Sequence, residues 1–224
     1  MISACRLVGF QMTRAKLSAQ VHRALRLDKH SVDHIAHHVL MVERVYQRAD
    51  EFDIIHSHID YFPFSTARRS PTPVVTTLHG RLDLPDLEPI YLEFCDMPVI
   101  SISDAQREPI PNASWAGTIY HGLPDFPYKF HEEQGDYLAF LGRICPEKRV
   151  DHAIDIAKRV GMKLKIAAKV DRVDQEYYNA LIKPLLDHPL IEYVGELGEA
   201  EKVDFLGNAA ALIFPIDWPE PFGL

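Results

Sequence analysis

The sequence has few cysteines, no excess of positive charge and no long hydrophobic run. Its three cysteines, Cys5, Cys95 and Cys145, are odd in number and far apart, which favours free thiols in a reducing compartment over a disulfide framework. Lys and Arg total 24 against 32 Asp and Glu, giving a net charge of −8, which argues against non-specific nucleic-acid binding. No run approaches the roughly 18 apolar residues of a membrane span, and the first residues lack a secretory signal. These absences predict a soluble cytoplasmic protein.

What is present is a regular alternation of strands and helices in the second half. Four strand-like runs alternate with three helical patterns; the strands are 136–144, 163–170, 191–197 and 211–217, and the helices are 146–160, 174–187 and 198–209. Such alternation implies βαβ units. It predicts the α/β class with a parallel sheet.

The first half repeats this pattern less cleanly. Five runs rich in β-branched residues read as strands, at 5–10, 53–60, 72–80, 97–103 and 115–122. A helix is predicted over 37–52, with Leu40, Val42 and Val45 pointing inward, and shorter helical pieces over 86–95 and 104–108. Two successive α/β domains are therefore expected.

The two ends of the sequence look unfinished. The last strand-like run is followed only by DWPEPFGL, with no covering helix, and residues 1–20 contain a single glycine, Gly9. A parallel sheet needs both faces covered, and a doubly wound domain normally opens on a glycine-rich turn. We therefore expect a chain truncated at both ends.

Three segments place chemistry at the end of a predicted strand, where open α/β sheets bind ligands. GRICPEKR (142–149) puts Arg143 and Lys148 near a helix N-terminus, which suits a diphosphate. WPEPFGL holds Glu220 on a proline-fixed loop, where a carboxylate can accept hydrogen bonds from hydroxyls. TTLHG (76–80) places His79 where it can bind substrate or transfer a proton. Surface cations, a solvated glutamate and a structural histidine are the plainer readings of the same residues.

The order of six motifs resembles the retaining family-four glycosyltransferases. The motifs are TLHG, SISDAQR, YHGLP, YLAFLGRICPEKR, YVGEL with EKVDFLGNAAALIFP, and WPEPFGL, and they cover the chain from about residue 35 to 224. The resemblance implies a GT-B fold of two Rossmann-like parallel-sheet domains facing a cleft, both incomplete here. It implies a partial N-terminal acceptor-side domain over 1–126, a linker over 127–135 and a partial nucleotide-sugar-binding domain over 136–224.

The activity implied by the resemblance is transfer of a sugar from a nucleotide-sugar donor to a hydroxyl acceptor, with retention of anomeric configuration. Arg143 and Lys148 are similar to the pair that binds the donor diphosphate, and Glu220 to the glutamate that holds donor hydroxyls. His79 matches the histidine that reaches the donor sugar. Further donor-binding positions are implied at Gly195, Glu196, Leu197, Phe222, Gly223 and Leu224. No metal and no cofactor beyond the nucleotide-sugar co-substrate are implied, while peripheral membrane association stays open.

The chain also departs from the family pattern. The second glutamate of the family motif would fall beyond Leu224, and Arg149 stands where the family often has glycine. A non-catalytic, truncated sugar-nucleotide-binding fragment is therefore the alternative function.

A metal-dependent hydrolase is the more distant alternative. His56 and His58 alternate along a strand and so point to one side, which permits joint metal ligation. No later set of His and Asp completes such a site. The cluster of His34, His37 and His38 on a helix face has solvated histidines as its simpler interpretation.

Overall fold

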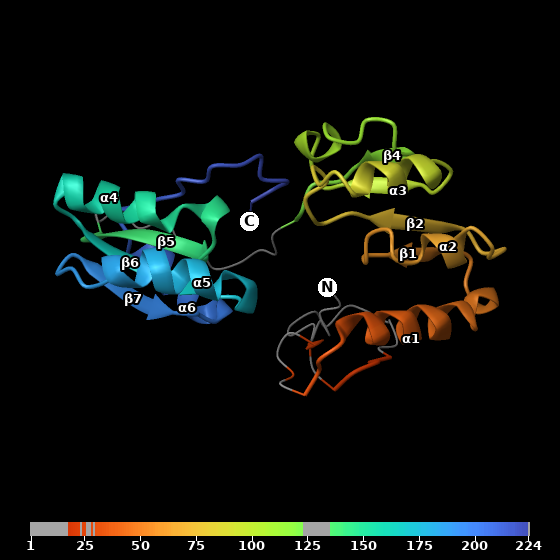
Figure 1. Ribbon diagram of the computed structural model, residues 1–224, viewed down its shortest axis with the longest axis horizontal. Coiled ribbons are helices and arrows are strands. Elements are labelled where there is room, and N and C mark those ends of the chain that lie inside the picture. Colours follow the sequence, from red (N-terminus) through yellow and green to blue (C-terminus); the bar gives the residue numbers. More distant parts are fainter. Residues whose placement is uncertain (1–17, 23, 26–27, 29, 123–134, 224) are drawn as a thin grey trace. The chain divides into compact units, whose positions relative to one another are not determined.

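The computed structural model describes residues 18–22, 24–25, 28, 30–122 and 135–223 (Figure 1). The chain divides into two compact units, one comprising residues 1–122 with 220–224 and the other residues 123–219. Each unit contains one sheet of four parallel strands. This confirms the α/β class; the predicted strand 5–10 and the linker residues 127–134 lie outside the described residues.

The first unit has the strand order β1-β2-β3-β4. Its strands are short, and they are β1 (Ile55–Ser57), β2 (Val74–Thr77), β3 (Val99–Ser101) and β4 (Trp115–Thr118). Its α-helices are α1 (His34–Tyr46), α2 (Phe64–Ala67) and α3 (Leu87–Glu93), with 3₁₀ turns at Ala49–Glu51 and Ala105–Arg107. The core joins α2 and α3 to the sheet through residues such as Phe64, Tyr91, Leu78 and Val99.

One inward-facing prediction for α1 is wrong. Val42 is buried, but Leu40 is 53% exposed. Two residues separate these positions, which turns them by about 200° around a helix of 3.6 residues per turn, so both cannot face the same core. The helix spans His34–Tyr46 rather than the predicted 37–52, and it begins at His34 because the Asp33 side chain accepts hydrogen bonds from the amides of Ile35 and Ala36.

The second unit has the strand order β7-β6-β5-β8. Its strands are β5 (Tyr137–Arg143), β6 (Lys163–Lys169), β7 (Ile191–Gly195) and β8 (Ala211–Leu212). Its helices are α4 (Val150–Val160), α5 (Gln175–Tyr177) and α6 (Glu199–Gly207), with a π-helix at Tyr178–Ile182 and 3₁₀ turns at Pro146–Lys148, Arg172–Asp174 and Lys183–Leu185.

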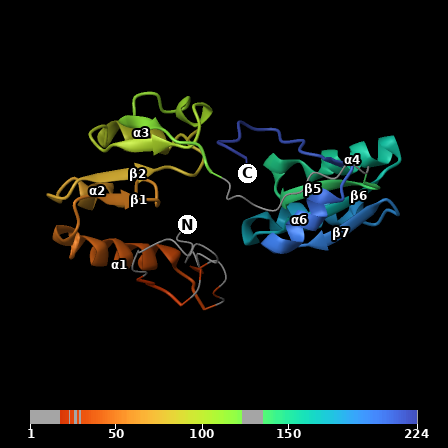
Figure 2. The ribbon, with the colours of Figure 1, turned by 180° about the vertical axis from the view of Figure 1, so that it is seen from behind.

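Helices cover both faces of this second sheet (Figures 1 and 2). Successive residues of a strand point to opposite faces. Leu138 and Phe140 of β5 accordingly join a core with Ile154 of α4, while Tyr137 packs with Phe205 of α6 on the other face. The apolar run of β5 is thus explained by burial on both sides, as in other parallel sheets.

Three predicted elements of the second unit are shorter or more broken than expected. The helix predicted over 146–160 starts only at Val150, because Arg149 has a left-handed backbone with φ 49°. The helix predicted over 174–187 becomes three short pieces, and Pro184 lies where its missing N–H disrupts the α pattern. Only Ala211 and Leu212 of the run 211–217 pair within the sheet.

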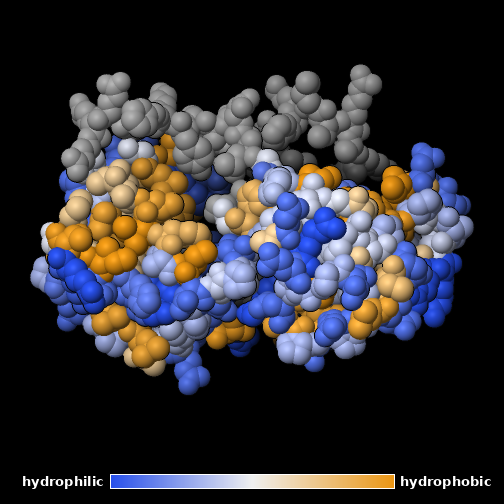
Figure 3. Space-filling model, turned by 90° about the horizontal axis from the view of Figure 1, so that it is seen from above, coloured by the Kyte–Doolittle hydropathy of each residue, from blue (hydrophilic) through white to orange (hydrophobic). Residues whose placement is uncertain are grey.

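The surface mixes polar and apolar residues. Figure 3 shows apolar patches interrupted by hydrophilic side chains on the face that it presents. Within the described ranges, no helix combines the length and the hydrophobicity that crossing a membrane would require. Cys95 and Cys145 are free cysteines, the first exposed and the second buried.

Candidate functional site

The carboxyl edge of the first sheet carries a row of imidazole rings. The rings of His56 and His58 have centroids 4.3 Å apart, which confirms that the two share one side of the strand. Nδ1 of His58 lies 2.8 Å from Nε2 of His79, which is the second residue after β2. The ring of His79 stacks on that of His121, with centroids 5.3 Å apart and planes 8° from parallel. The fold therefore brings His79 together with three histidines from neighbouring strand ends.

The backbone around His79 is held by Gln106, a residue that the sequence analysis did not single out. The Gln106 side-chain amide donates to the carbonyl oxygens of Leu78 at 3.2 Å and Gly80 at 2.8 Å. Its oxygen accepts from the Ile102 amide at 2.9 Å. Gln106 is 3% exposed, so these bonds satisfy a buried amide group and tie the ends of β2 and β3 together.

The histidine row favours neutral rings. The pKa of His79 lies below its ordinary value because the surrounding protein displaces water and because His121 lies beside it. The pKa of His58 is lowered by partial burial first, and then by His56 and His79. Both residues remain solvent-exposed overall, so solvent screening limits the size of these shifts.

This arrangement does not resemble a metal centre. Two histidine nitrogens that bind one tetrahedral zinc ion are about 3.3 Å apart, given Zn–N bonds of about 2.0–2.1 Å. The nitrogens of His58 and His79 are 2.8 Å apart, which is a hydrogen-bond distance. No group of three or more His, Cys, Asp and Glu side chains in the described ranges is placed to hold a metal ion.

In the second unit, Arg143 is the last residue of β5 and lies between two carboxylates. Its Nε is 3.3 Å from Oδ2 of Asp174, and its Nη1 is 3.6 Å from Oδ2 of Asp171. Asp171 also pairs with Lys169 at 3.0 Å. Burial raises the pKa of Asp174, and the charge of Arg143 opposes that rise. The Arg143 side chain is 41% exposed, although its Nε is buried.

Lys148 and Arg149 follow Arg143 at the start of α4. The Lys148 ammonium lies 5.2 Å from the centre of the Phe214 ring, within the range of a cation–π contact. Arg149 pairs with Asp151 at 3.0 Å and with Asp217 at 2.8 Å. Its φ of 49° lies in the left-handed region, which glycine adopts at no steric cost. In this chain, the two ion pairs hold an arginine there instead.

The remaining predicted donor-binding residues fall into two groups. Gly195 ends β7 with φ 83°; Glu196 after it is exposed, and Leu197 packs near Phe205. The tail residues belong to the first unit by their contacts. Phe222 has ring contacts with His121 at 4.9 Å and Tyr120 at 6.0 Å between centroids.

Of the other tail residues, Glu220 is half-buried and Gly223 has φ 77°. Leu224 lies outside the described residues. The fold therefore gathers Arg143, Lys148 and Gly195 at one edge of the second sheet. The first unit holds His79 together with the tail.

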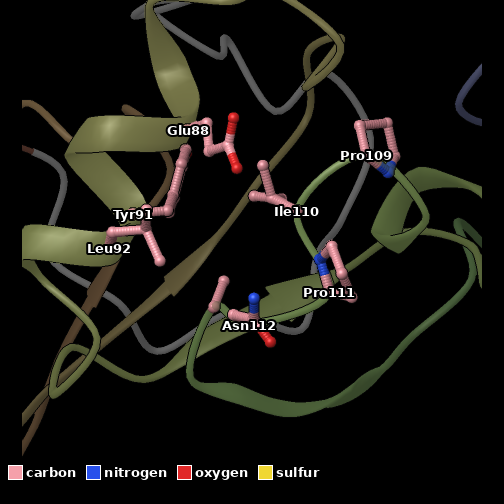
Figure 4. Close-up of a pocket in the computed structure, with 8 residues that line it drawn as sticks. Glu88, Tyr91, Leu92, Pro109, Ile110, Pro111 and Asn112 are labelled. Atoms are coloured by element: carbon pink, nitrogen blue, oxygen red, sulfur yellow. The ribbon is translucent and has the colours of Figure 1, made fainter.

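A small pocket lies elsewhere in the first unit, away from the predicted site residues. It has a volume of about 20 Å³, which is room for about one water molecule. Figure 4 shows Glu88, Tyr91 and Leu92 of α3 on one side of it and the Pro109–Asn112 loop on the other. No predicted site residue lines it.

Sequence reasoning missed the groups that surround the predicted residues. Asp171 and Asp174 follow β6 by two and five residues, so a search of strand ends for acids as well as cations would have found them. Gln106 gave no comparable signal, because a glutamine in a single 3₁₀ turn belongs to no periodic pattern that would mark it as buried.

Comparisons with known proteins identify the architecture. The sequence matches no protein-family model and no curated protein sequence. Among solved structures, 80% of the chain matches 40% of S. aureus TarM in a complex with fondaparinux, alpha-GlcNAc-glycerol and UDP, with a TM-score of 0.61 and 15% identity. The catalytic domain of starch synthase IV from Arabidopsis thaliana, bound to ADP and acarbose, matches 83% of the chain over 56% of its own length, with a TM-score of 0.53 and 15% identity.

A glycosyltransferase involved in avilamycin A biosynthesis gives a third match. It covers 76% of this chain and 48% of its own, with a TM-score of 0.50 and 20% identity. At such identities the similarity establishes the fold. The chain has the GT-B fold of these glycosyltransferases and spans between 40% and 56% of their lengths.

Proposed function

We propose that this chain is part of a retaining glycosyltransferase that takes a sugar from a nucleotide-sugar donor to a hydroxyl acceptor. The proposal rests mainly on one observation, the placement of Arg143 and Lys148 at the carboxyl edge of β5 beside the start of α4. The similar GT-B structures that contain UDP and ADP support it. So does the resemblance of six sequence motifs to family-four enzymes.

The start of α4 is suited to an anion. The helix has 11 residues, and no side chain of the described residues caps its N-terminus. The positive end of the helix dipole therefore faces this position without a side-chain cap, which favours an anion such as a phosphate group. Arg143 and Lys148 add two full charges, which would stabilise the charge that develops on a departing nucleoside diphosphate.

Asp171 and Asp174 limit how Arg143 can bind a diphosphate. Their carboxylates pair with Arg143 in the structure described above. A diphosphate that binds Arg143 has to compete with both of them for the same guanidinium donors. Donor binding is therefore expected to reorient the Arg143 side chain, or to share its five donors among several oxygens.

The first unit supplies the groups proposed for the sugar. His79 offers an imidazole at the end of β2, and Glu220 offers a carboxylate for donor hydroxyls. Phe222 and Gly223, with Leu224, follow the glutamate as backbone and apolar contacts. The second unit supplies the proposed neighbours of the nucleobase, which are Gly195, Glu196 and Leu197.

Calorimetric titration with UDP-, GDP- and ADP-sugars tests the proposal. We expect one donor to bind, and we expect Arg143→Ala and Lys148→Ala each to weaken it about tenfold, the effect of one charge-assisted contact. Lys163→Ala is the matched control, because Lys163 begins β6 at the opposite edge of the sheet and pairs with Glu192. No binding at millimolar concentration would refute the proposal.

Catalysis needs a separate measurement. Release of nucleoside diphosphate in the presence of hydroxyl acceptors would support transfer, and NMR of the anomeric proton of the product would test retention. Binding without any turnover would favour the alternative of a sugar-nucleotide-binding fragment.

A further inference from the structure

The hydrogen bond between two imidazoles at the edge of the first sheet constrains what His79 can do. A neutral imidazole has one donor nitrogen and one acceptor nitrogen. With Nδ1 of His58 and Nε2 of His79 at 2.8 Å, one of the two carries the proton and the other accepts it. Whichever of the two arrangements holds, Nε2 of His79 is occupied, and Nδ1 is the nitrogen that remains for a ligand.

The position of the His79 ring is fixed by more than this bond. His121 stacks on it, with centroids 5.3 Å apart. The backbone on both sides of His79 is held by the Gln106 amide. His58 itself follows β1, where Nε2 of the neighbouring His56 lies 2.8 Å from Oγ1 of Thr77. A ring held on these sides cannot flip without breaking its bond to His58.

The charges around His58 and His79 are compatible with a hydrogen bond between two neutral imidazoles. Among the described residues, the groups that act on these two rings, besides each other, are His56, His121 and the carboxylate of Asp60. Partial burial and the neighbouring imidazoles disfavour protonation of both His58 and His79, while Asp60 acts in the opposite direction on His79. Two imidazolium ions could not form the bond, because neither would offer a lone pair.

We propose that His58 is a positioning residue for His79: it occupies Nε2, couples the tautomer of the His79 ring to its own and leaves Nδ1 for the donor sugar. The coupling of the two tautomers stands on the hydrogen bond, and the ring orientation on this bond with the His121 stacking, whereas the use of Nδ1 for a sugar rests on the proposed function. His58 acts through His79 in this scheme and does not contact the substrate. It is therefore distinct from the metal-ligand role considered for it on sequence grounds.

Two isosteric substitutions separate this role from general folding effects. The amide of asparagine lies near the position of Nδ1 in histidine, and that of glutamine near Nε2. His58→Asn therefore keeps a hydrogen-bonding group facing His79, while His58→Gln removes it. Both variants are polar and neutral, so they suit the exposed site equally. His56→Phe is the control, because His56 bonds to Thr77 and not to His79.

Long-range ¹H–¹⁵N NMR of ¹⁵N-histidine-labelled protein reads the tautomer directly. We expect the ratio of the two His79 tautomers to change by about threefold to tenfold in His58→Gln, the range of one net hydrogen bond. The ratio should stay near the wild-type value in His58→Asn and His56→Phe. An unchanged ratio in His58→Gln, or an equal change in His56→Phe, would overturn the proposal.

A second measurement joins the tautomer to donor binding. We expect His58→Gln to weaken binding of the intact nucleotide sugar by about threefold to tenfold and to leave binding of the sugar-free nucleoside diphosphate unchanged. Equal weakening of both ligands would contradict the use of Nδ1 for the sugar. Absence of any nucleotide binding in the wild-type chain would refute the proposed function, while the tautomer result would still decide the role of His58.

Discussion

Gly195 offers a test of how the backbone at the end of β7 shapes the proposed donor site. Its φ is 83°, and an added Cβ would have no atom within 4 Å. Gly195→Ala therefore introduces backbone strain without a steric clash. A non-glycine residue in the left-handed region costs about 1–2 kcal/mol, and alanine recovers about 0.4–1 kcal/mol through the unfolded chain. The net expected loss of stability is about 1 kcal/mol.

Gly161 supplies a matched control for this substitution. Its φ is 69°, and an added Cβ again meets nothing within 4 Å. It follows α4, at the opposite end of the helix from Lys148. Gly161→Ala should cost about the same 1 kcal/mol of unfolding free energy and leave donor affinity unchanged. Gly195→Ala should also weaken donor binding about fivefold to tenfold, because the strained peptide directly precedes Glu196.

Urea unfolding and calorimetry measure the two quantities. Each unit contains one tryptophan, Trp115 in the first and Trp218 in the second. A Trp115→Phe background therefore leaves a fluorescence probe for the second unit alone. Equal loss of affinity in both glycine variants would show that the effect is one of stability. No loss of stability in either variant would refute the reasoning from backbone strain.

Three further predictions concern two buried hydroxyls and pH. Tyr137→Phe should cost about 1 kcal/mol of unfolding free energy, because the Tyr137 hydroxyl donates to the Phe205 carbonyl at 2.6 Å. Tyr91→Phe should be neutral or stabilising in the same urea assay, because the buried Tyr91 hydroxyl has no hydrogen-bond partner among the described residues. The first unit should lose stability as pH falls below about 6.5, because the pKa values of His58 and His79 are lowered and the unfolded chain then binds more protons than the folded one. Thermal melts from pH 7.5 to 5 check this, and a double substitution of both histidines by phenylalanine should flatten the slope.

The sequence predicted the class of fold because periodicity is a local property. The apolar run of β5 and the helical spacing of α4 both follow from residues near each other in the chain. The ends of the elements were less predictable. Arg149 is left-handed because of contacts with Asp151 and Asp217, and the second of these residues is 68 positions away. No local pattern can report a contact of that kind.

For the candidate site, too, some features could be predicted from the sequence and others only from the tertiary structure. The sequence by itself placed His79 and Arg143 at strand ends, since the residue that follows a strand can be read from the strand. Only the tertiary structure decided their partners: His58 and His121 reach His79 from other strands, and Asp171 reaches Arg143 from the end of β6. The physical reason is that parallel pairing aligns the carboxyl ends of strands distant in sequence, and side-chain geometry there depends on their register and twist.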